Sequence, residues 1–293
     1  MSVPVSTTQE VLSRPSDTTR DDRIYRETRW LCAIIVPFLI AAFYILYLRP
    51  TETKELFAWP IKPPMSARML AAAYAGGIFF FTRAFFARRW HHITLGFLPV
   101  TAFASAMGIA TFLHWDKFTH DHISFVTWVA LYVTTPFLVV ATWLRNRQTD
   151  PGTPEEKDII LSQPIRYLVG AIGIITIVNG IVLFLQPDFM VGIWGWTLTP
   201  LTARVLGGMF ALPGVVGLGI AVDPRWSAAR IILQSQIFSI IFILLAVVLS
   251  WNDFDQTKLA TWLFVGGMAL LVVILPALYF YVEYRLQKGS STT

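Results

Sequence analysis

The chain has 293 residues, of which 55% are hydrophobic and only 14% are charged, and its mean hydropathy is +0.58. Its apolar residues form runs of about 20, the length at which a helix crosses a ~30 Å hydrocarbon core. This pattern excludes an ordinary soluble domain and predicts an all-α integral membrane protein. The net charge of +5 does not indicate nucleic acid binding, because the positive residues cluster at the ends of the apolar runs.

The chain begins with a polar segment. Residues 1–28 are rich in Ser, Thr, Asp and Arg and lack an apolar signal region, so we expect a disordered cytosolic tail. Eight transmembrane helices should follow. Their expected ranges are 30–48, 66–86, 93–113, 123–143, 165–185, 202–222, 229–249 and 260–280. Cys32 is the only cysteine, so neither an internal disulfide nor a Cys-ligated metal site is expected.

Charge next to the spans predicts the topology. With both termini inside, sixteen Lys and Arg residues lie inside and seven lie outside. The positive-inside rule therefore favours a multi-pass protein of the cytoplasmic membrane with its N-terminus and C-terminus in the cytosol.

The longer connections carry further expectations. The outer loops 49–65 and 186–201 are aromatic and long enough to form short interfacial helices. The polar segment 149–164 is expected to be a cytosolic linker, with Thr153 capping a short helix.

The two halves of the chain resemble each other. "PMSAR" at 64–68 matches "PLTAR" at 200–204, and other Arg, Trp and Pro positions recur at offsets of 134 to 137. We therefore predict two four-helix repeats, 29–148 and 165–285, and a cytosolic tail at 286–293. Four spans separate equivalent points, so the repeats should run parallel and be related by a pseudo-two-fold axis along the membrane normal.

Arg68 and Arg204 occupy matching positions near two helix starts on the outer side. The leading expectation is that each contacts lipid headgroups or an aspartate of the next outer loop, Asp116 for Arg68 and Asp253 or Asp255 for Arg204. The alternative is an anion site that combines the guanidinium with helix N–H groups.

Tryptophans gather near the span ends and are expected to form an interfacial aromatic belt. They include Trp59, Trp90, Trp115, Trp194, Trp196, Trp226 and Trp251. Glycine pairs within the spans should allow close helix packing. These are Gly76-Gly77, Gly170 with Gly173, Gly207-Gly208 and Gly266-Gly267.

Polar residues are scarce inside the spans. Asn179, Gln234 and Gln236 are the clearest, and they are expected to hydrogen-bond between helices or, less favoured, to line a polar solute path. His91 and His92 stand beside Arg88 and Arg89, which favours a cluster facing headgroups over a ligand site.

The stretch "HWDKFTHDH" at 114–122 holds three of the five histidines. Its counterpart "SWNDFDQTK" at 250–258 keeps the Trp and the Phe but none of the histidines, so the shared feature is a helical hairpin turn. Thr119 or Asp121 should cap the next span. His114, His120 and His122 remain minor candidates for a metal site or a pH-responsive cluster.

The sequence contains no pattern of a known catalytic site. The favoured function is a non-catalytic accessory or scaffold component of the membrane, without a cofactor, whose partners are the lipid bilayer and a membrane protein or a second copy of the chain. The first alternative is a transporter or channel for a small or apolar solute, with its site between the repeats. The second alternative is a membrane enzyme or metal-binding protein that uses the outer loop 114–122.

Overall fold

The computed structural model describes residues 20–290, and it is all-helical. Eight helices within this range are long and apolar enough to span a membrane, as the sequence predicts. They are α1 (Arg26–Phe43, continued by a π-helical turn through Leu48), α3 (Pro64–Phe86), α4 (Phe97–Leu113), α5 (Ile123–Asn146), α6 (Gln163–Leu185), α8 (Pro200–Val222), α9 (Trp226–Leu249) and α10 (Leu259–Ser290). The protein is therefore a multi-pass membrane protein, and a lipid bilayer is its environment.

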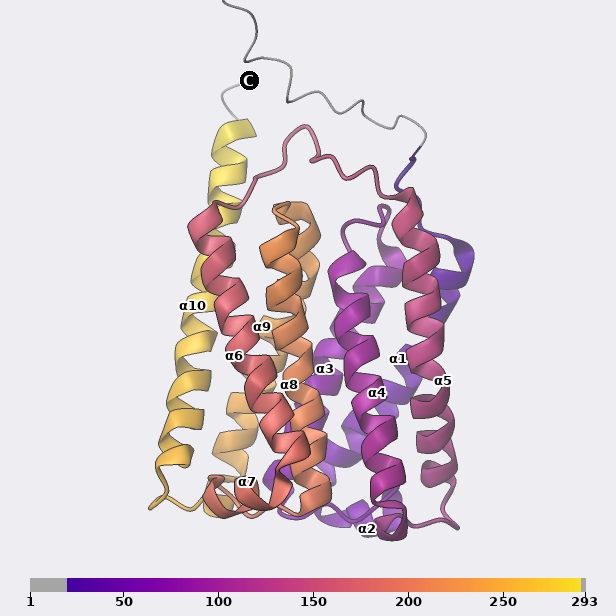
Figure 1. Cartoon of the computed structure of the whole chain (residues 1–293), viewed down its shortest axis with the longest axis vertical. Coiled ribbons are helices and arrows are strands. Elements are labelled where there is room, and N and C mark those ends of the chain that lie inside the picture. Colours follow the sequence, from indigo (N-terminus) through magenta and orange to yellow (C-terminus); the bar gives the residue numbers. More distant parts are fainter. Residues whose placement is uncertain (1–19, 291–293) are drawn as a thin grey trace, which may run out of the picture.

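The helices stand side by side, with first-half helices on one side of the bundle and second-half helices on the other (Figure 1). Contacts within the halves join α1 to α3, α4 to α5, α6 to α8, and α9 to α10. Contacts between the halves join α3 to α9 and α4 to α8. The centre of the bundle is thus built from α3, α4, α8 and α9, with the other four helices packed around it.

One end of the bundle carries both ends of the described chain and the connection between α5 and α6, and we call it the termini side (Figure 1). The opposite end, here called the far side, carries two short helices, α2 (Thr53–Leu56) and α7 (Pro187–Ile193). They lie in the loops 49–65 and 186–201, where the sequence predicts short helices.

Segments at the termini side differ from expectation. Residues 1–19 of the expected tail lie outside the described residues, but residues 20–28 are not a free tail, because Asp22 and Ile24 are buried and α1 already begins at Arg26. Thr153 caps no helix, since residues 150–162 form no helix. Ile160 instead forms a bridge with Arg225, so backbone pairing replaces the expected helix. Helix α10 continues through Ser290, well into the expected tail 286–293.

Glycines set the closest helix contacts. A Cβ added to Gly173 would stand 2.8 Å from the carbonyl oxygen of Gly214, and one on Gly207 would stand 2.6 Å from that of Gly180. Helices α6 and α8 therefore touch backbone to backbone. The packing prediction is wrong for Gly266 and Gly267, because a Cβ at either would meet no described atom within 4 Å.

The aromatic-belt interpretation is wrong for four tryptophans. Trp59, Trp90, Trp196 and Trp226 are all 3% exposed or less. The indole of Trp196 reaches across the halves and donates to Ser66 Oγ at 2.9 Å. These rings fill the ends of the bundle core, whereas Trp115, at 42% exposed, fits the expected interfacial position.

Candidate ligand site between the halves

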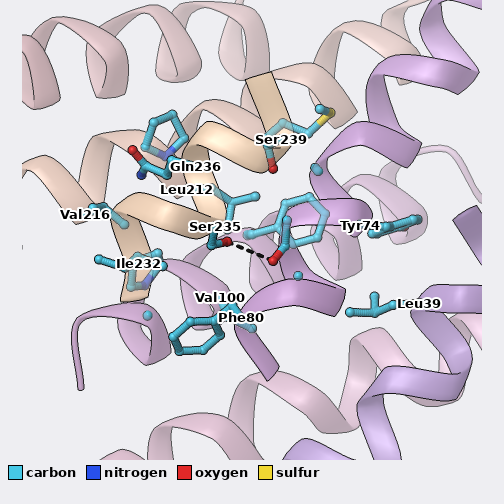
Figure 2. A pocket seen from close by; sticks show the side chains of 18 of the residues that line it. Leu39, Tyr74, Phe80, Val100, Leu212, Val216, Ile232, Ser235, Gln236 and Ser239 are labelled. Carbon is cyan, nitrogen blue, oxygen red and sulfur yellow. Dashed lines mark hydrogen bonds between the residues drawn. The ribbon is translucent and has the colours of Figure 1, made fainter. Parts of the chain in front are cut away.

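A cavity of about 210 Å³ lies at mid-depth of the bundle. Both halves build its wall, through α1, α3, α4 and α5 on one side and α8, α9 and α10 on the other. Leu39, Tyr74, Phe80 and Val100 represent the first half in Figure 2, and Leu212, Val216, Ile232, Ser235, Gln236 and Ser239 represent the second. The lining residues of α3 and α9 fall near the middle of each helix, so the cavity lies in the hydrocarbon region.

The cavity wall is strongly apolar. None of its lining residues, all within the described chain, is Asp, Glu, Lys, Arg or His. A dry engineered cavity of ~150 Å³ lined by Leu, Ile and Phe binds benzene rather than water. A larger space with a similar wall suits an apolar molecule and offers no path for ions.

Three of the polar side chains on the wall have hydrogen-bond partners. Ser235 donates its hydroxyl hydrogen to the carbonyl oxygen of Gly76 at 2.8 Å, which is the dashed line in Figure 2. The hydroxyls of Tyr74 and Tyr132 are 2.8 Å apart and hydrogen-bond to each other. These pairs hold α3 to α9 and α3 to α5 beside the cavity.

Gln236, on this wall, carries a buried polar atom that has no partner in the described part of the chain. Its Nε2 atom is buried and has no hydrogen-bond partner among the described residues. Leaving such an amide donor unsatisfied costs about 1–3 kcal/mol. A rotation of the side chain that brings Nε2 to the cavity would let an acceptor oxygen on a bound molecule remove this cost, so Gln236 is a candidate anchor for one polar group of an otherwise apolar ligand.

The three polar residues expected inside the spans do not converge. Asn179 is exposed on α6 and donates to the carbonyl oxygen of Ile175 at 2.8 Å. Gln234 donates to the Tyr279 hydroxyl at 2.6 Å, which joins α9 to α10. Only Gln236 lines the cavity. The prediction of interhelical bonding therefore holds for Gln234, and a polar path through all three residues is wrong.

The paired arginines contact the opposite half instead of nearby aspartates. Arg68 Nη1 donates to Ser250 Oγ at 2.5 Å and to the Leu249 carbonyl oxygen at 3.1 Å. It thus stabilises the negative end of the α9 dipole. Arg204 Nη1 lies 2.5 Å from His114 Nε2, at the end of α4. The expected pairings with aspartates are wrong because of how the helices pack. Helix α3 runs antiparallel to α9, so Arg68 at the start of α3 lies beside the end of α9. Helix α8 runs antiparallel to α4, so Arg204 at the start of α8 lies beside the end of α4.

Asp253 serves a different group. Its Oδ2 atom accepts a hydrogen bond from the Met65 amide nitrogen at 2.8 Å. The carboxylate therefore caps the first turn of α3, where the helix dipole favours a negative charge.

The outer histidines do not gather into a metal site. His114 contacts Arg204, His120 Nε2 lies 3.0 Å from the Trp115 carbonyl oxygen, and His122 Nδ1 accepts from Ser124. His122 is the N-cap of α5, so the prediction of Thr119 or Asp121 is wrong. Partial burial and the Arg204 charge lower the pKa of His114.

Sequence reasoning finds Gln236 but misses the rest of the cavity wall. Tyr74, Tyr132 and Ser239 give no sequence signal, because apolar and hydroxyl residues on a membrane helix face lipid, neighbours or a cavity equally well. The sequence also does not predict that His91 is buried, with 1% of its surface exposed. The expectation that His91 and His92 face lipid headgroups is therefore wrong for His91.

Comparisons of the chain with protein-family models, with curated proteins and with solved structures give no match. The function must therefore be argued from the site itself.

Proposed function

We propose that the protein binds an apolar, membrane-soluble molecule in the cavity between its halves, as a non-enzymatic carrier or presenting protein. The observation that carries this proposal is the cavity's apolar wall combined with the unpartnered Gln236 amide. A suitable ligand has a hydrocarbon body and one acceptor oxygen, as in a ketone, ester or quinone. This proposed function is a form of the first alternative that the sequence suggests, a transporter for a small or apolar solute.

We also propose that the halves are two parallel repeats and that the cavity lies on their pseudo-two-fold axis. The helix pairs support this, since α1–α3, α4–α5 and α3–α9 recur as α6–α8, α9–α10 and α8–α4. The cavity wall supports it too, because several lining residues of the first half have a lining residue 136 positions later, at the equivalent place in the second half. Examples are Gly76 with Leu212, Phe80 with Val216, Val100 with Gln236 and Phe103 with Ser239.

The proposal is tested by filling the cavity. Val216→Phe places a larger ring on the cavity wall, where Val216 is 2% exposed. Val222→Phe is the matched control, since Val222 lies on the same helix and is 80% exposed. Apolar molecules extracted from the purified wild-type protein are quantified per chain by mass spectrometry. We expect a specific molecule in the wild type and in the control, and its loss from Val216→Phe.

The polar contact is tested in the same assay. Gln236→Leu removes the amide donor, and Gln234→Leu, two positions along, removes an amide that bonds Tyr279 instead. We expect reduced occupancy only in Gln236→Leu. If correctly folded Val216→Phe carries the same molecules in the same amounts as the wild type, the cavity is not a ligand site.

The accessory or scaffold role remains a separate prediction, as do the cytosolic placement of both termini and the cytoplasmic membrane as location. A scaffold should co-purify with one partner protein in constant ratio and carry no specific small molecule. An enzyme or metal-binding protein that uses the loop 114–122 would require its histidines to converge on one ligand. His114, His120 and His122 instead each contact a different residue.

A further inference from the structure

A buried polar cluster lies on the termini side, away from the cavity. Three connecting segments meet there, and Asp22 joins them. The Asp22 amide donates to Thr149 O at 2.9 Å, and its carbonyl oxygen accepts from the Trp90 amide at 2.8 Å. Its carboxylate accepts from the His91 amide at 3.0 Å. The segment before α1, the loop 87–93 and the linker are thereby held as one unit.

Two histidines and a carboxylate converge within this unit. His91 Nε2 lies 3.3 Å from Glu155 Oε1, and His92 Nε2 lies 2.6 Å from the same oxygen. One ligand atom from each of the three residues lies within 4.8 Å of the other two. His91 is buried, whereas His92 and Glu155 are about 30% exposed at their side chains.

If His91 is neutral, its Nε2 atom has no hydrogen-bond donor to face. Asp22 Oδ2 is 2.5 Å from Nδ1, which fixes the hydrogen on that atom. Nε2 faces Ser227 Oγ at 3.0 Å, but Ser227 gives its only hydroxyl hydrogen to Asp158 Oδ2. A neutral His91 therefore directs its Nε2 lone pair at oxygen lone pairs. Either a proton on Nε2, which Glu155 Oε1 at 3.3 Å could accept, or a metal cation between these atoms removes the repulsion.

The cluster contains charged groups of both signs. Asp22, Glu155 and Asp158 supply three carboxylates, and Arg89 pairs with Glu155 at 2.8 Å. Arg83 and Lys157 lie on the wall of the adjoining cavity together with Glu155 and Asp158. Arg225 is compensated separately, since Asp150 and Asp223 both pair with it.

We propose that His91 Nε2, His92 Nε2 and Glu155 Oε1 form a site for a divalent transition metal of the zinc class, with Asp22 as the group that orients His91. In tetrahedral zinc coordination, bond lengths of ~2.0–2.1 Å separate neighbouring ligand atoms by ~3.3 Å. The 3.3 Å between His91 Nε2 and Glu155 Oε1 fits this edge. The 2.6 Å contact between His92 Nε2 and Glu155 Oε1 must open by about 0.7 Å as the metal replaces the hydrogen between them.

A second cavity of about 180 Å³ adjoins the cluster. His92, Glu155, Asp158 and Ser227 lie on its wall together with Arg83, Lys157 and Arg230. Arg230 pairs with Glu283 at 2.9 Å. A metal with three protein ligands and an open position next to cationic side chains would take water, hydroxide or a small anion there.

The test uses Co²⁺ as a visible-light probe for the zinc site. The full chain is purified without a polyhistidine tag, stripped with EDTA and titrated with Co²⁺, followed by Zn²⁺. We expect one Co²⁺ per chain with tetrahedral absorption bands that Zn²⁺ abolishes. His92→Ala and Glu155→Gln should each weaken binding at least 10-fold. Asp22→Asn should weaken it about 10- to 100-fold while retaining the bands, as expected for loss of an orienting carboxylate.

The control variant is His120→Ala with His122→Ala, which removes two far-side histidines and should leave the titration unchanged. Gel filtration and thermal unfolding select variants that remain folded, and His92→Ala is the milder change because His92 is partly exposed. The proposal is overturned if the wild type shows no saturable Co²⁺ binding, or if a folded His92→Ala variant binds as tightly. In either case the cluster is only a hydrogen-bonded and ion-paired network.

Discussion

At the scale of single residues, the same residue type takes different roles that depend on its neighbours. Gln234 and Gln236 are two positions apart, yet one bonds Tyr279 and the other lies on the cavity wall with a buried, unpartnered amide nitrogen. Trp59 and Trp196 occupy matching positions and are both buried, although tryptophan near a span end usually faces the interface. Sequence identifies such residues as unusual but does not give their neighbours, which only tertiary packing supplies.

Gly76 gives a sharp prediction at this scale. A Cβ there would stand 2.0 Å from Ser239 Oγ and 3.0 Å from the Ser235 carbonyl oxygen. We expect Gly76→Ala to push α3 from α9 and to destabilise the protein by about 1–3 kcal/mol, as overpacking does. Thermal unfolding in detergent measures the effect. Gly266→Ala, with open space around its Cβ, should cause no such loss, and equal stability of the two variants would contradict the assigned contact.

At the scale of elements, the linker is a docked part of the fold. Leu161 donates its amide hydrogen to the Pro224 carbonyl oxygen, and Asp158 accepts from the Ser227 amide. Composition predicts a polar connection here but not its docking, because the partners lie 63 and 69 positions further along the chain. Asp150 and Asp223 flank the buried Arg225, and their hydrogen bonds outweigh burial and raise the pKa of its guanidinium.

Removing this charge should release the linker. Arg225→Gln leaves two partly buried carboxylates without their cation, a change that typically costs about 3–5 kcal/mol. We expect faster trypsin cleavage after Lys157 and a lower unfolding temperature. Arg49→Gln breaks an exposed pair with Glu52 and should have little effect on either measurement. An intact linker in Arg225→Gln would contradict the docking role.

At the scale of the whole molecule, hydropathy predicts nearly all of the architecture. The eight spans and both short far-side helices follow from run length and aromatic loops, since a helix that crosses lipid must be long and apolar. The cavity could not be predicted in this way. It depends on how α3, α4, α8 and α9 fit together, and no local pattern distinguishes a side chain facing lipid from one facing an internal space.

Orientation in the membrane is a prediction at this scale. Positive charge favours a cytosolic termini side, so a cysteine at position 153 should be inside and one at position 117 outside. In a Cys32→Ser background, a membrane-impermeant maleimide should label Lys117→Cys in intact cells. It should label Thr153→Cys only after the membrane is opened. The reverse pattern would invert the topology.

The depth of the apolar cavity determines how it can select a ligand. A molecule that enters from the bilayer core leaves surroundings as apolar as the cavity wall, so burying its hydrocarbon body again gains almost no free energy. Partitioning has already concentrated that body in the membrane, by roughly fourfold for each CH₂ group worth ~0.8 kcal/mol. Discrimination then rests on shape and on the single hydrogen bond that Gln236 can donate. Chain length would govern how much ligand reaches the site, and the position of one oxygen atom would govern which ligand stays.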